Sequence, residues 1–265
     1  EILSFHTEAY VNAVEKFSNG YNLTNQGEFN FSEMGDNPIY GGMYEASMLS
    51  TGASLLAAEM LIRGDADIAF NCSGGLHHAM TNHASGFCIF NDPVIAINLL
   101  LKHGLRVAYI DIDAHHGDGV QQAFYGSNKV MTISIHESGS FLFPGTGFTH
   151  EIGVGPGFGY SVNLPLMPNT PDEVYALAAS ELISPIVEWF APDILVTQLG
   201  MDPYFRDPIT HLGLTIQGHA HLVKTFRDLA NSIPWLALGG GGYDISAVIR
   251  GWTIDYGIML DMIWP

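Results

Sequence analysis

Five short apolar runs alternate with longer stretches of helical character along most of the chain. The runs occupy residues 66–72, 105–112, 130–135, 193–199 and 234–238. Each is nearly continuous in apolar side chains, which is typical of strands that are buried on both faces. Because helical stretches separate them, the runs predict a parallel sheet with helices on both faces. The expected fold class is therefore α/β, organised as a single domain.

Four stretches before and between these runs predict helices, at residues 46–63, 92–103, 170–190 and 217–230. The first is followed by Gly64, which suits the left-handed conformation of a C-cap. In the second, Asp92 is the expected N-cap and Pro93 the first helical residue. The third opens with TPDE (170–173), which predicts a capping box. The polar segment 18–37, rich in Gly and Asn, predicts a loop.

Polar clusters follow four of the five predicted strands directly. They read GGLHH (74–78), DIDAHHGD (111–118), GMD (200–202) and GGGGY (239–243). The carboxyl ends of parallel strands lie at one edge of a sheet, and ligands bind in the crevice outside that edge. We therefore expect four separate segments to contribute to one site.

The residues Asp113, His115 and Asp202 form a candidate set of metal ligands. Asp113 and His115 are two positions apart, so at a strand end they would point the same way. Two carboxylates and one imidazole leave a coordination position open for water, as in catalytic rather than structural zinc sites. Ferrous iron accepts the same ligand types, so the residues do not separate the two metals.

The tandem histidines His77 and His78 suggest proton transfer, because the carboxylates of Asp111 and Asp118 are available to pair with them. Such a partner fixes the tautomer of an imidazole and raises its basicity. One ring could take a proton from water and return it to a leaving amine, while the other stays cationic. Tyr243 follows four glycines, and its hydroxyl could donate to an oxyanion.

Charge and cysteine content narrow the expected partners and compartment. With 27 acidic and 9 basic residues, the formal net charge is -18, which would repel phosphates and makes direct nucleic acid binding unexpected. Such a surface could attract basic peptides or polyamines, or simply maintain solubility. Cys72 and Cys88 lie in apolar stretches and predict buried free thiols in a cytoplasmic protein. No apolar run reaches 18 residues, so we expect no membrane span.

Six motifs resemble the histone deacetylase family and occur in its order. They are GGLHHA (74–79), ASGFC (84–88), DIDAHHGDG (111–119), FPGTG (143–147), QLGMD (198–202) and LGGGGY (238–243). The similarity runs over nearly the whole chain, and the GLHH and GMD variants look closest to the prokaryotic acetoin-utilisation branch. The resemblance implies the arginase/deacetylase fold and zinc-dependent hydrolysis of the acetyl amide of N-acetyl-lysine in proteins, with release of acetate.

The resemblance also implies catalytic roles for individual residues. Zinc would be bound by the three candidate ligands Asp113, His115 and Asp202. His78 would act as general base and acid and His77 as its charged partner. The pairing would be His77 with Asp111 and His78 with Asp118, and Tyr243 would polarise the amide carbonyl.

Substrate and potassium sites are implied in the same way. The substrate would meet a rim aspartate and the walls of a narrow tunnel, formed by Asp36, Gly86, Phe87, Phe143 and Ile209. Two flat aromatic faces suit the methylene stem of a lysine. A structural potassium ion would be bound by Asp111, Asp113, His115, Ser134 and Ile135. A second would lie near Phe124, Ser127, Val130 and Tyr160.

The chain also departs from the family pattern and leaves alternatives open. We expect residues 1–265 to form one deacetylase catalytic domain that lacks the family's N-terminal strand, an arginine near the acetate exit, and part of the C-terminus after Pro265. Acetylpolyamine hydrolysis uses the same chemistry and remains a rival, as does a non-catalytic scaffold that binds acyl-lysine. An arginase-like enzyme with two manganese ions is disfavoured, since Gly117 and Tyr204 occupy the second-metal positions. The sequence gives no oligomeric state.

Overall fold

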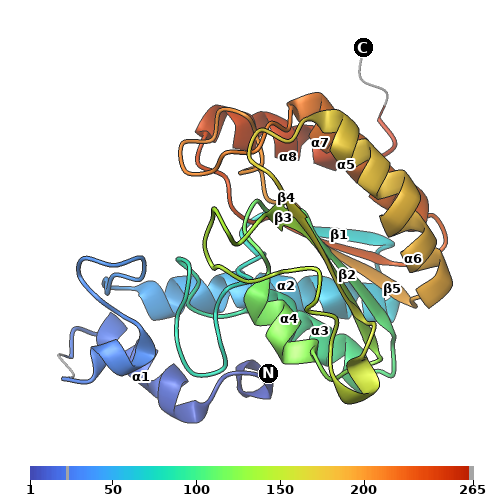
Figure 1. Cartoon of the computed structure of the whole chain (residues 1–265). Helices are drawn as coiled ribbons and strands as arrows, with labels where there is room; N and C mark the ends of the chain where they lie inside the picture. The colour runs from blue at the N-terminus through green and yellow to red at the C-terminus, as the bar shows by residue number, and fades with distance from the viewer. Residues whose placement is uncertain (22–23, 263–265) are drawn as a thin grey trace.

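Six parallel strands form one sheet at the centre of the molecule (Figure 1). The computed structural model describes residues 1–21 and 24–262, so two positions of the 18–37 segment and the chain end at Pro265 lie outside it. The sheet order is β1-β6-β5-β2-β3-β4. The strands are β1 (Ile68–Asn71), β2 (Val107–Asp111), β3 (Val130–Glu137), β4 (Ser161–Leu166), β5 (Ile194–Gln198) and β6 (Trp235–Leu238). All five predicted strands are confirmed, and β4 is an additional strand at the edge.

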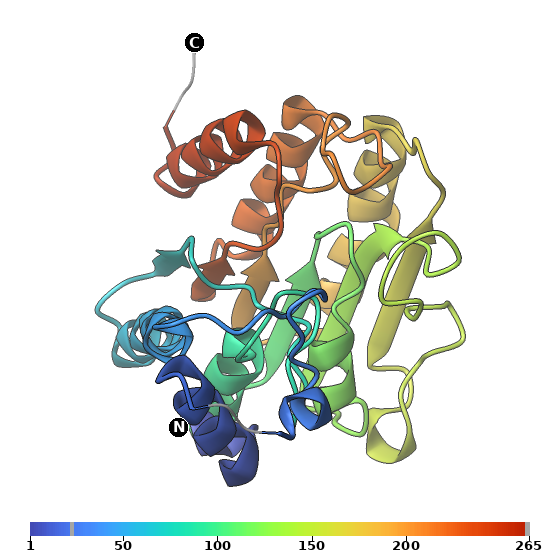
Figure 2. The same cartoon turned by 90° about the vertical axis from the view of Figure 1, so that its left-hand side faces the viewer.

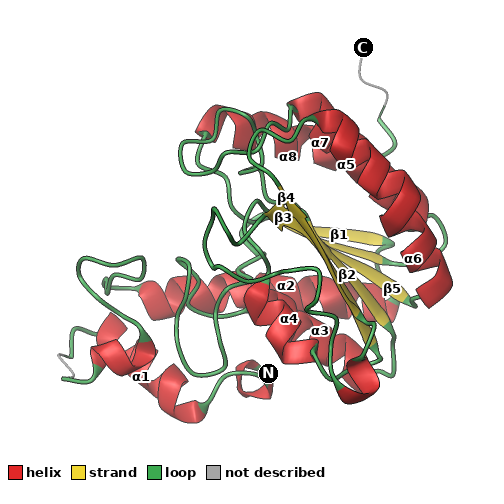
Figure 3. Ribbon diagram, in the orientation of Figure 1, coloured by secondary structure: helices red, strands yellow, loops and turns green. Residues whose placement is uncertain are grey.

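Helices cover both faces of this sheet, which confirms the α/β class (Figure 3). One face carries α2 (Met43–Arg63), α3 (Asp92–Lys102) and α4 (Asp118–Phe124). The other carries α5 (Asp172–Ala178), α6 (Ser184–Phe190), α7 (Ile216–Leu229) and α8 (Ile245–Met259). Each face has its own buried apolar cluster, because side chains of successive strand residues point to opposite sides. The sheet is therefore held in place by two cores.

The N-terminal segment adds a third, smaller core beside α2 (Figure 2). It contains η1 (Ile2–Ser4), α1 (Glu8–Ser18) and the 3₁₀ turn η2 (Gln26–Phe29). The predicted loop 18–37 thus contains one helical turn. Tyr10 of α1 packs against Phe29 of η2 and against Phe90, which lies two residues before α3. This places the N-terminal segment against the part of the chain that leads into the candidate site.

Helix ends agree with the sequence in one place and differ in two. Gly64 adopts φ 71° and its N–H bonds the Leu61 carbonyl, as expected of a C-cap. The N-cap of α3 is Asn91 rather than Asp92, because the Asn91 side chain accepts from Val94 N–H. The predicted capping box at 170–173 is wrong. The Thr170 hydroxyl donates to the Met167 carbonyl instead, and α5 begins at Asp172 with no side-chain cap.

The predicted helix 170–190 is present as three consecutive segments. A π-helical segment, η4 (Ala179–Ile183), joins α5 to α6.

The two cysteines differ in environment. Cys88 is buried as predicted, whereas Cys72 is exposed, because β1 ends at Asn71 and the chain has already left the sheet. Among the described residues, no helix combines the length and apolar character needed to cross a membrane.

Candidate active site

A cavity of about 350 Å³ opens beyond the carboxyl ends of β1, β2 and β6. Its lining includes His77 and His78 from the segment after β1, Asp113 and His115 from the segment after β2, and Tyr243 from the segment after β6. Loops outside the sheet complete the walls. The parallel topology therefore brings the predicted polar clusters to a single site.

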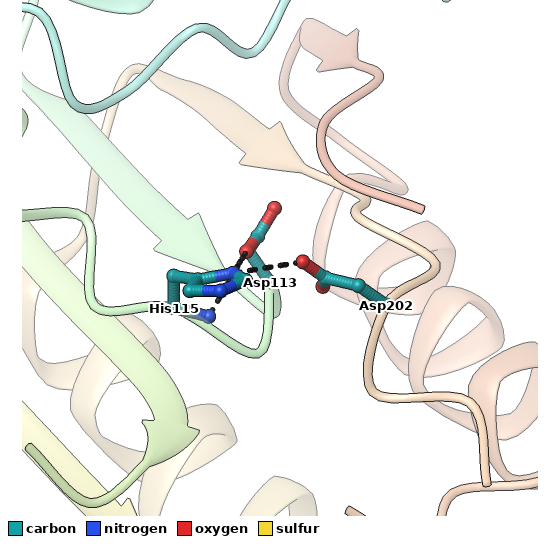
Figure 4. A group of neighbouring side chains, drawn as sticks. All are labelled: Asp113, His115 and Asp202. Carbon is teal, nitrogen blue, oxygen red and sulfur yellow. Dashed lines mark hydrogen bonds and ion pairs between the residues drawn. The ribbon is translucent and has the colours of Figure 1, made fainter. Parts of the chain in front are cut away.

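The side chains of Asp113, His115 and Asp202 converge on one another (Figure 4). Asp113 and His115 are buried residues of the cavity lining, and we call this part of the cavity its deep end. His115 Nδ1 lies 3.0 Å from Asp113 Oδ1 and 2.9 Å from Asp202 Oδ2. The sequence suggested that Asp113 and His115 lie at the end of a strand. β2 ends at Asp111, so both residues belong instead to the loop that follows it. The loop turns tightly, since Asp113 N–H donates to Asp111 Oδ1 at 3.1 Å and His115 N–H to Asp113 Oδ1 at 2.9 Å.

The donor set of this group fits a divalent metal ion. One ligand atom from each side chain lies within 4.8 Å of the others, and all three residues are buried. Burial disfavours a charged His115 ring, but hydrogen bonds with the two carboxylates outweigh it and raise the pKa of His115 to about 11. The raised pKa indicates that the two carboxylates give this buried pocket a negative potential. A metal cation coordinated by the same three side chains would neutralise that negative charge.

The outer oxygens of the two carboxylates are fixed by neighbouring donors. Gln198 Nε2 donates to Asp113 Oδ2 at 2.6 Å, and the Gly241 N–H donates to the same oxygen at 2.8 Å. The Ala114 N–H donates to Asp202 Oδ1 at 2.7 Å. Such contacts orient the remaining lone pairs towards one another. These hydrogen bonds within the protein therefore hold the Asp113 and Asp202 carboxylates in their converging positions.

The tandem histidines lie beside this group, each with its own carboxylate. His77 Nδ1 is 2.7 Å from Asp111 Oδ2, and His78 Nδ1 is 2.7 Å from Asp118 Oδ1. The two Nε2 atoms are 3.0 Å apart. The structure thus brings together the residue pairs that the resemblance implied.

The surroundings of the two histidines set their protonation states apart. Burial disfavours charge on His77, but the carboxylates of Asp111 and Asp113 prevail and raise the pKa of His77 to about 9. Burial and the neighbouring charge of His77 lower the pKa of His78 to about 4. Near neutral pH, His77 is therefore cationic and His78 neutral. A neutral imidazole can accept a proton, whereas a cationic one supplies fixed positive charge.

Tyr243 reaches the cavity from the glycine run after β6. A Cβ at Gly241 would lie 2.9 Å from Asp113 Oδ2, so only glycine allows the run to pass so close to the carboxylates. Burial, together with the charges of Asp113 and Asp202, raises the pKa of the Tyr243 hydroxyl. The hydroxyl therefore stays protonated and can donate a hydrogen bond towards the cavity.

All five residues implied in substrate binding line the same cavity: Asp36, Gly86, Phe87, Phe143 and Ile209. Phe87 and Phe143 are 56% and 42% exposed, so they are wall residues and not core aromatics. The Phe143 ring lies 5.0 Å from that of His78, and the Phe87 ring 6.1 Å from that of Tyr243. Gly86 adopts φ 49°, and a Cβ there would lie 2.5 Å from the His78 ring. A larger residue at 86 would therefore narrow the cavity at the histidines.

The residues implied in potassium binding form two separate groups along β3. Asp111 and Ser134 are register partners in β2 and β3, and the Ser134 hydroxyl hydrogen-bonds His136 Nδ1 at 2.8 Å. In the second group, the Phe124 carbonyl accepts from Ser127 N–H at 2.9 Å, and the Tyr160 carbonyl accepts from Thr132 N–H at 3.0 Å. Each carbonyl retains a second lone pair for another partner.

Several supporting residues escaped the sequence analysis. Gln198 orients Asp113, Tyr109 donates its hydroxyl to Asp111 at 2.7 Å, and Asn37 accepts from the Phe87 N–H. Asn91 donates to the carbonyls of His77 and Ala79. A usable signal existed for Gln198, which is the polar residue at the end of a strand that is buried throughout. The other supporting residues depend on contacts between distant segments.

Comparison with known proteins gives a consistent result. The model of the histone deacetylase domain family matches residues 1–258. The chain is 43% identical over 258 residues to acetoin utilization protein AcuC of Bacillus subtilis, covering 96% of the chain and 67% of that relative. It is 42% identical over 270 residues to human histone deacetylase 1, covering 100% of the chain and 55% of the relative. Histone deacetylase RPD3 of Saccharomyces cerevisiae is 39% identical over 264 residues, covering 99% of the chain and 60% of the relative.

The chain thus spans 55% to 67% of the length of these three relatives. The family match extends over all the strands and over the cavity described above. The similarity includes the bacterial relative that the GLHH and GMD variants suggested. This chain belongs to the histone deacetylase family.

Proposed function

We propose that the protein hydrolyses the acetyl amide of N-acetyl-lysine in proteins and releases acetate. One observation carries the proposal. Asp113 and His115, two of the three converging ligand residues, line one cavity with aromatic walls together with His77, His78 and Tyr243. This combination provides a metal site, a proton acceptor and an oxyanion donor, which together suit amide hydrolysis.

The metal ligands would be Asp113, His115 and Asp202, with zinc or ferrous iron as the ion. When bound, the ion would supply a Lewis acid for the acetyl carbonyl and for the attacking water. Two carboxylates and one imidazole leave positions open on such an ion for the substrate. The ligand atoms already face one another at 2.9 to 3.0 Å from His115 Nδ1.

The remaining chemistry belongs to the protein's own side chains. His78 Nε2, which lies 3.0 Å from His77 Nε2, exchanges that contact for the attacking water and accepts its proton, while its Nδ1 donates to Asp118. The Tyr243 hydroxyl donates to the developing oxyanion. The positive charge of His77, fixed by Asp111, stabilises negative charge in the same place. His78 then passes its proton to the departing lysine nitrogen, which releases the free amine and acetate.

The walls support an acylated lysine as the group that enters. The exposed rings of Phe87 and Phe143 offer apolar surface to a methylene stem, and Asp36 is available at the rim to accept backbone N–H groups. The net charge of -18 also favours a basic target. The same charge would suit an acetylated polyamine, so this is the second candidate substrate.

We further propose the two potassium sites described above and a cytoplasmic location. Two free cysteines are in keeping with a reducing compartment. No nucleic acid partner is proposed, because an acidic surface repels phosphates.

The test is acetate release from an acetyl-lysine peptide and from an acetylated polyamine, with added zinc, with added ferrous iron, and with chelator. Tyr243→Phe should lower kcat by about 10²- to 10³-fold, the usual cost of removing one oxyanion donor. Tyr256→Phe is the matched control, since this exposed tyrosine of α8 lies outside the cavity.

Metal-dependent turnover of the peptide that is lost in Tyr243→Phe would support the proposal. A strong preference for the polyamine would change the substrate but retain the chemistry. Absence of turnover on both substrates by metal-loaded protein would overturn the proposed activity and favour a scaffold that binds acyl-lysine.

A further inference from the structure

Tyr243 follows a backbone segment that has little rigidity of its own. Four glycines precede it, and Gly240 and Gly242 adopt φ near 150°, a region open mainly to glycine. The Tyr243 side chain is 37% exposed, and its aromatic neighbour Phe87 is itself 56% exposed. Side-chain packing therefore does little to place the hydroxyl, and the backbone must be fixed by something else.

Asp207 supplies the missing restraint. Its Oδ2 accepts the Tyr243 N–H at 2.8 Å. Its Oδ1 accepts the Ile209 N–H at 3.0 Å, and its own N–H donates to the Tyr204 carbonyl at 2.8 Å. The side chain is only 8% exposed, so water competes weakly for these bonds.

The two donors belong to different segments that line the cavity. Tyr243 comes from the segment after β6 and Ile209 from the segment after β5, and both line the cavity. One carboxylate thus joins the proposed oxyanion donor to a wall of the substrate tunnel. A hydrogen bond from a backbone N–H to a buried carboxylate is charge-assisted and short, which makes it an effective restraint.

We propose that Asp207 is a positioning residue that holds Tyr243 in reach of the acetyl carbonyl. This inference rests on the proposed deacetylase function. The carboxylate touches neither substrate nor metal ligand, so it acts through the backbone of Tyr243. Without it, the glycine run can move the hydroxyl away from the oxyanion while the metal group stays intact.

The variant Asp207→Asn tests this assignment. Its amide can accept one of the two N–H groups, but its NH₂ faces the other donor. We expect kcat to fall about ten- to a hundredfold, the range produced by misplacing a reacting group by up to about 1 Å, with a smaller change in KM. Asp244→Asn is the matched control, because it removes one charge from the adjacent residue while Asn remains a good N-cap for α8.

A double-mutant comparison separates positioning from general loss of structure. In a Tyr243→Phe background the hydroxyl is already absent, so adding Asp207→Asn should have little further effect on kcat. A loss of the same size in both backgrounds, or an unchanged kcat in the single variant, would overturn the assignment. If Asp207→Asn fails to fold, Asp207→Glu keeps the charge and moves the carboxylate by one methylene, with the same expected loss of kcat.

Amide exchange provides a readout that does not depend on activity. The Tyr243 N–H should exchange faster with solvent deuterium in metal-loaded Asp207→Asn than in the wild type or in Asp244→Asn. If the wild type releases no acetate from either substrate, the proposed function fails. Faster exchange of the Tyr243 N–H in Asp207→Asn would still establish that Asp207 holds the Tyr243 backbone, the contact we call the tether. Unchanged exchange would overturn the tether whatever the activity.

Discussion

The deep end of the cavity and its outer walls are built in opposite ways. Asp113 and Asp202 are at most 1% exposed, and their oxygens accept hydrogen bonds from Gln198, Ala114 and Gly241. Phe87 and Phe143 are about half exposed and lie on loops. A buried, multiply bonded carboxylate has one position, whereas an exposed ring has several. Changes at the deep end should therefore alter kcat, and changes at the walls should mainly alter KM.

The two regions are connected through the loop that carries Phe143. His116, next to the metal ligand His115, hydrogen-bonds Thr146 at 2.8 Å. Glu151 Oε1 accepts the N–H groups of Gly147 and Phe148, both at 2.9 Å. This wall is therefore tied to the metal loop, while the wall carrying Phe87 is bonded to the N-terminal segment, through the Phe87 N–H to Asn37 and through Asn30 to the Ala84 carbonyl. Phe87 is the better place to test the outer region alone.

The largest effect is expected from Asp202→Ala. This change removes one of three ligand atoms and leaves the Ala114 N–H without its acceptor. Activity should fall by about 10³-fold or more, since a bound metal supplies several kcal/mol of transition-state stabilisation. Metal content should fall with it, as measured by elemental analysis after dialysis. A variant that retains both full metal content and activity would contradict the ligand assignment.

A smaller effect at the deep end is expected from Asp118→Asn. The Asp118 carboxylate accepts from His78 Nδ1 and from the Gly119 N–H, so it fixes the orientation of the proposed base. Replacing an outer partner of this kind costs about 10- to 100-fold. The loss should appear in kcat, with metal content unchanged. A loss confined to KM would mean that His78 serves binding and not proton transfer.

At the outer wall, Phe87→Ala should act mainly on KM. The exposed ring offers apolar surface, and losing about 1 kcal/mol of contact raises KM roughly fivefold. Phe141→Ala is the control, because Phe141 is similarly exposed but lies outside the cavity. If Phe87→Ala lowers kcat as strongly as Asp118→Asn does, the contrast between the two regions is wrong.

The deep end could be predicted from the sequence because it depends on topology. Apolar runs indicate buried parallel strands, and the polar residues directly after them must gather at one edge. The positions of Asp113, His115 and Asp202 follow from that rule even though all three lie in loops beyond the strand ends. Strand β4 was missed, because Ser161, Asn163 and Pro165 interrupt its apolar character, as an edge strand tolerates.

Apart from Gln198, the supporting contacts could not be predicted, because they join segments far apart in the chain. Asp92 looks like an N-cap in isolation, but its buried carboxylate accepts the N–H groups of Gly75 and Leu76, and Asn91 caps the helix instead. Cys72 lies in an apolar run, yet it is exposed because the strand ends one residue earlier. Nothing in the sequence indicated a role for Asp207, because the N–H groups that donate to it, those of Ile209 and Tyr243, follow two different strands.

The last change concerns support for the deep end and should have the smallest effect on the reaction. His6, on the N-terminal segment, accepts the Asn91 N–H at 2.9 Å through Nε2, and Asn91 in turn donates to the His77 carbonyl. Burial lowers the pKa of His6 from 6.5 to about 4. Between these values the unfolded chain binds more protons than the folded one, so stability falls as pH decreases through this window.

This linkage can be measured with His6→Gln, whose amide oxygen can accept the same N–H without titrating. From pH 7 to pH 5 the His6 contribution costs the wild type about 2 kcal/mol of unfolding free energy, which the variant should not lose. Denaturant unfolding of the metal-loaded proteins at both pH values gives the comparison. His221→Asn, at an exposed position on α7, should follow the wild type. An equal pH dependence in wild type and His6→Gln would mean that the N-terminal segment does not stabilise the tandem-histidine loop through a neutral His6.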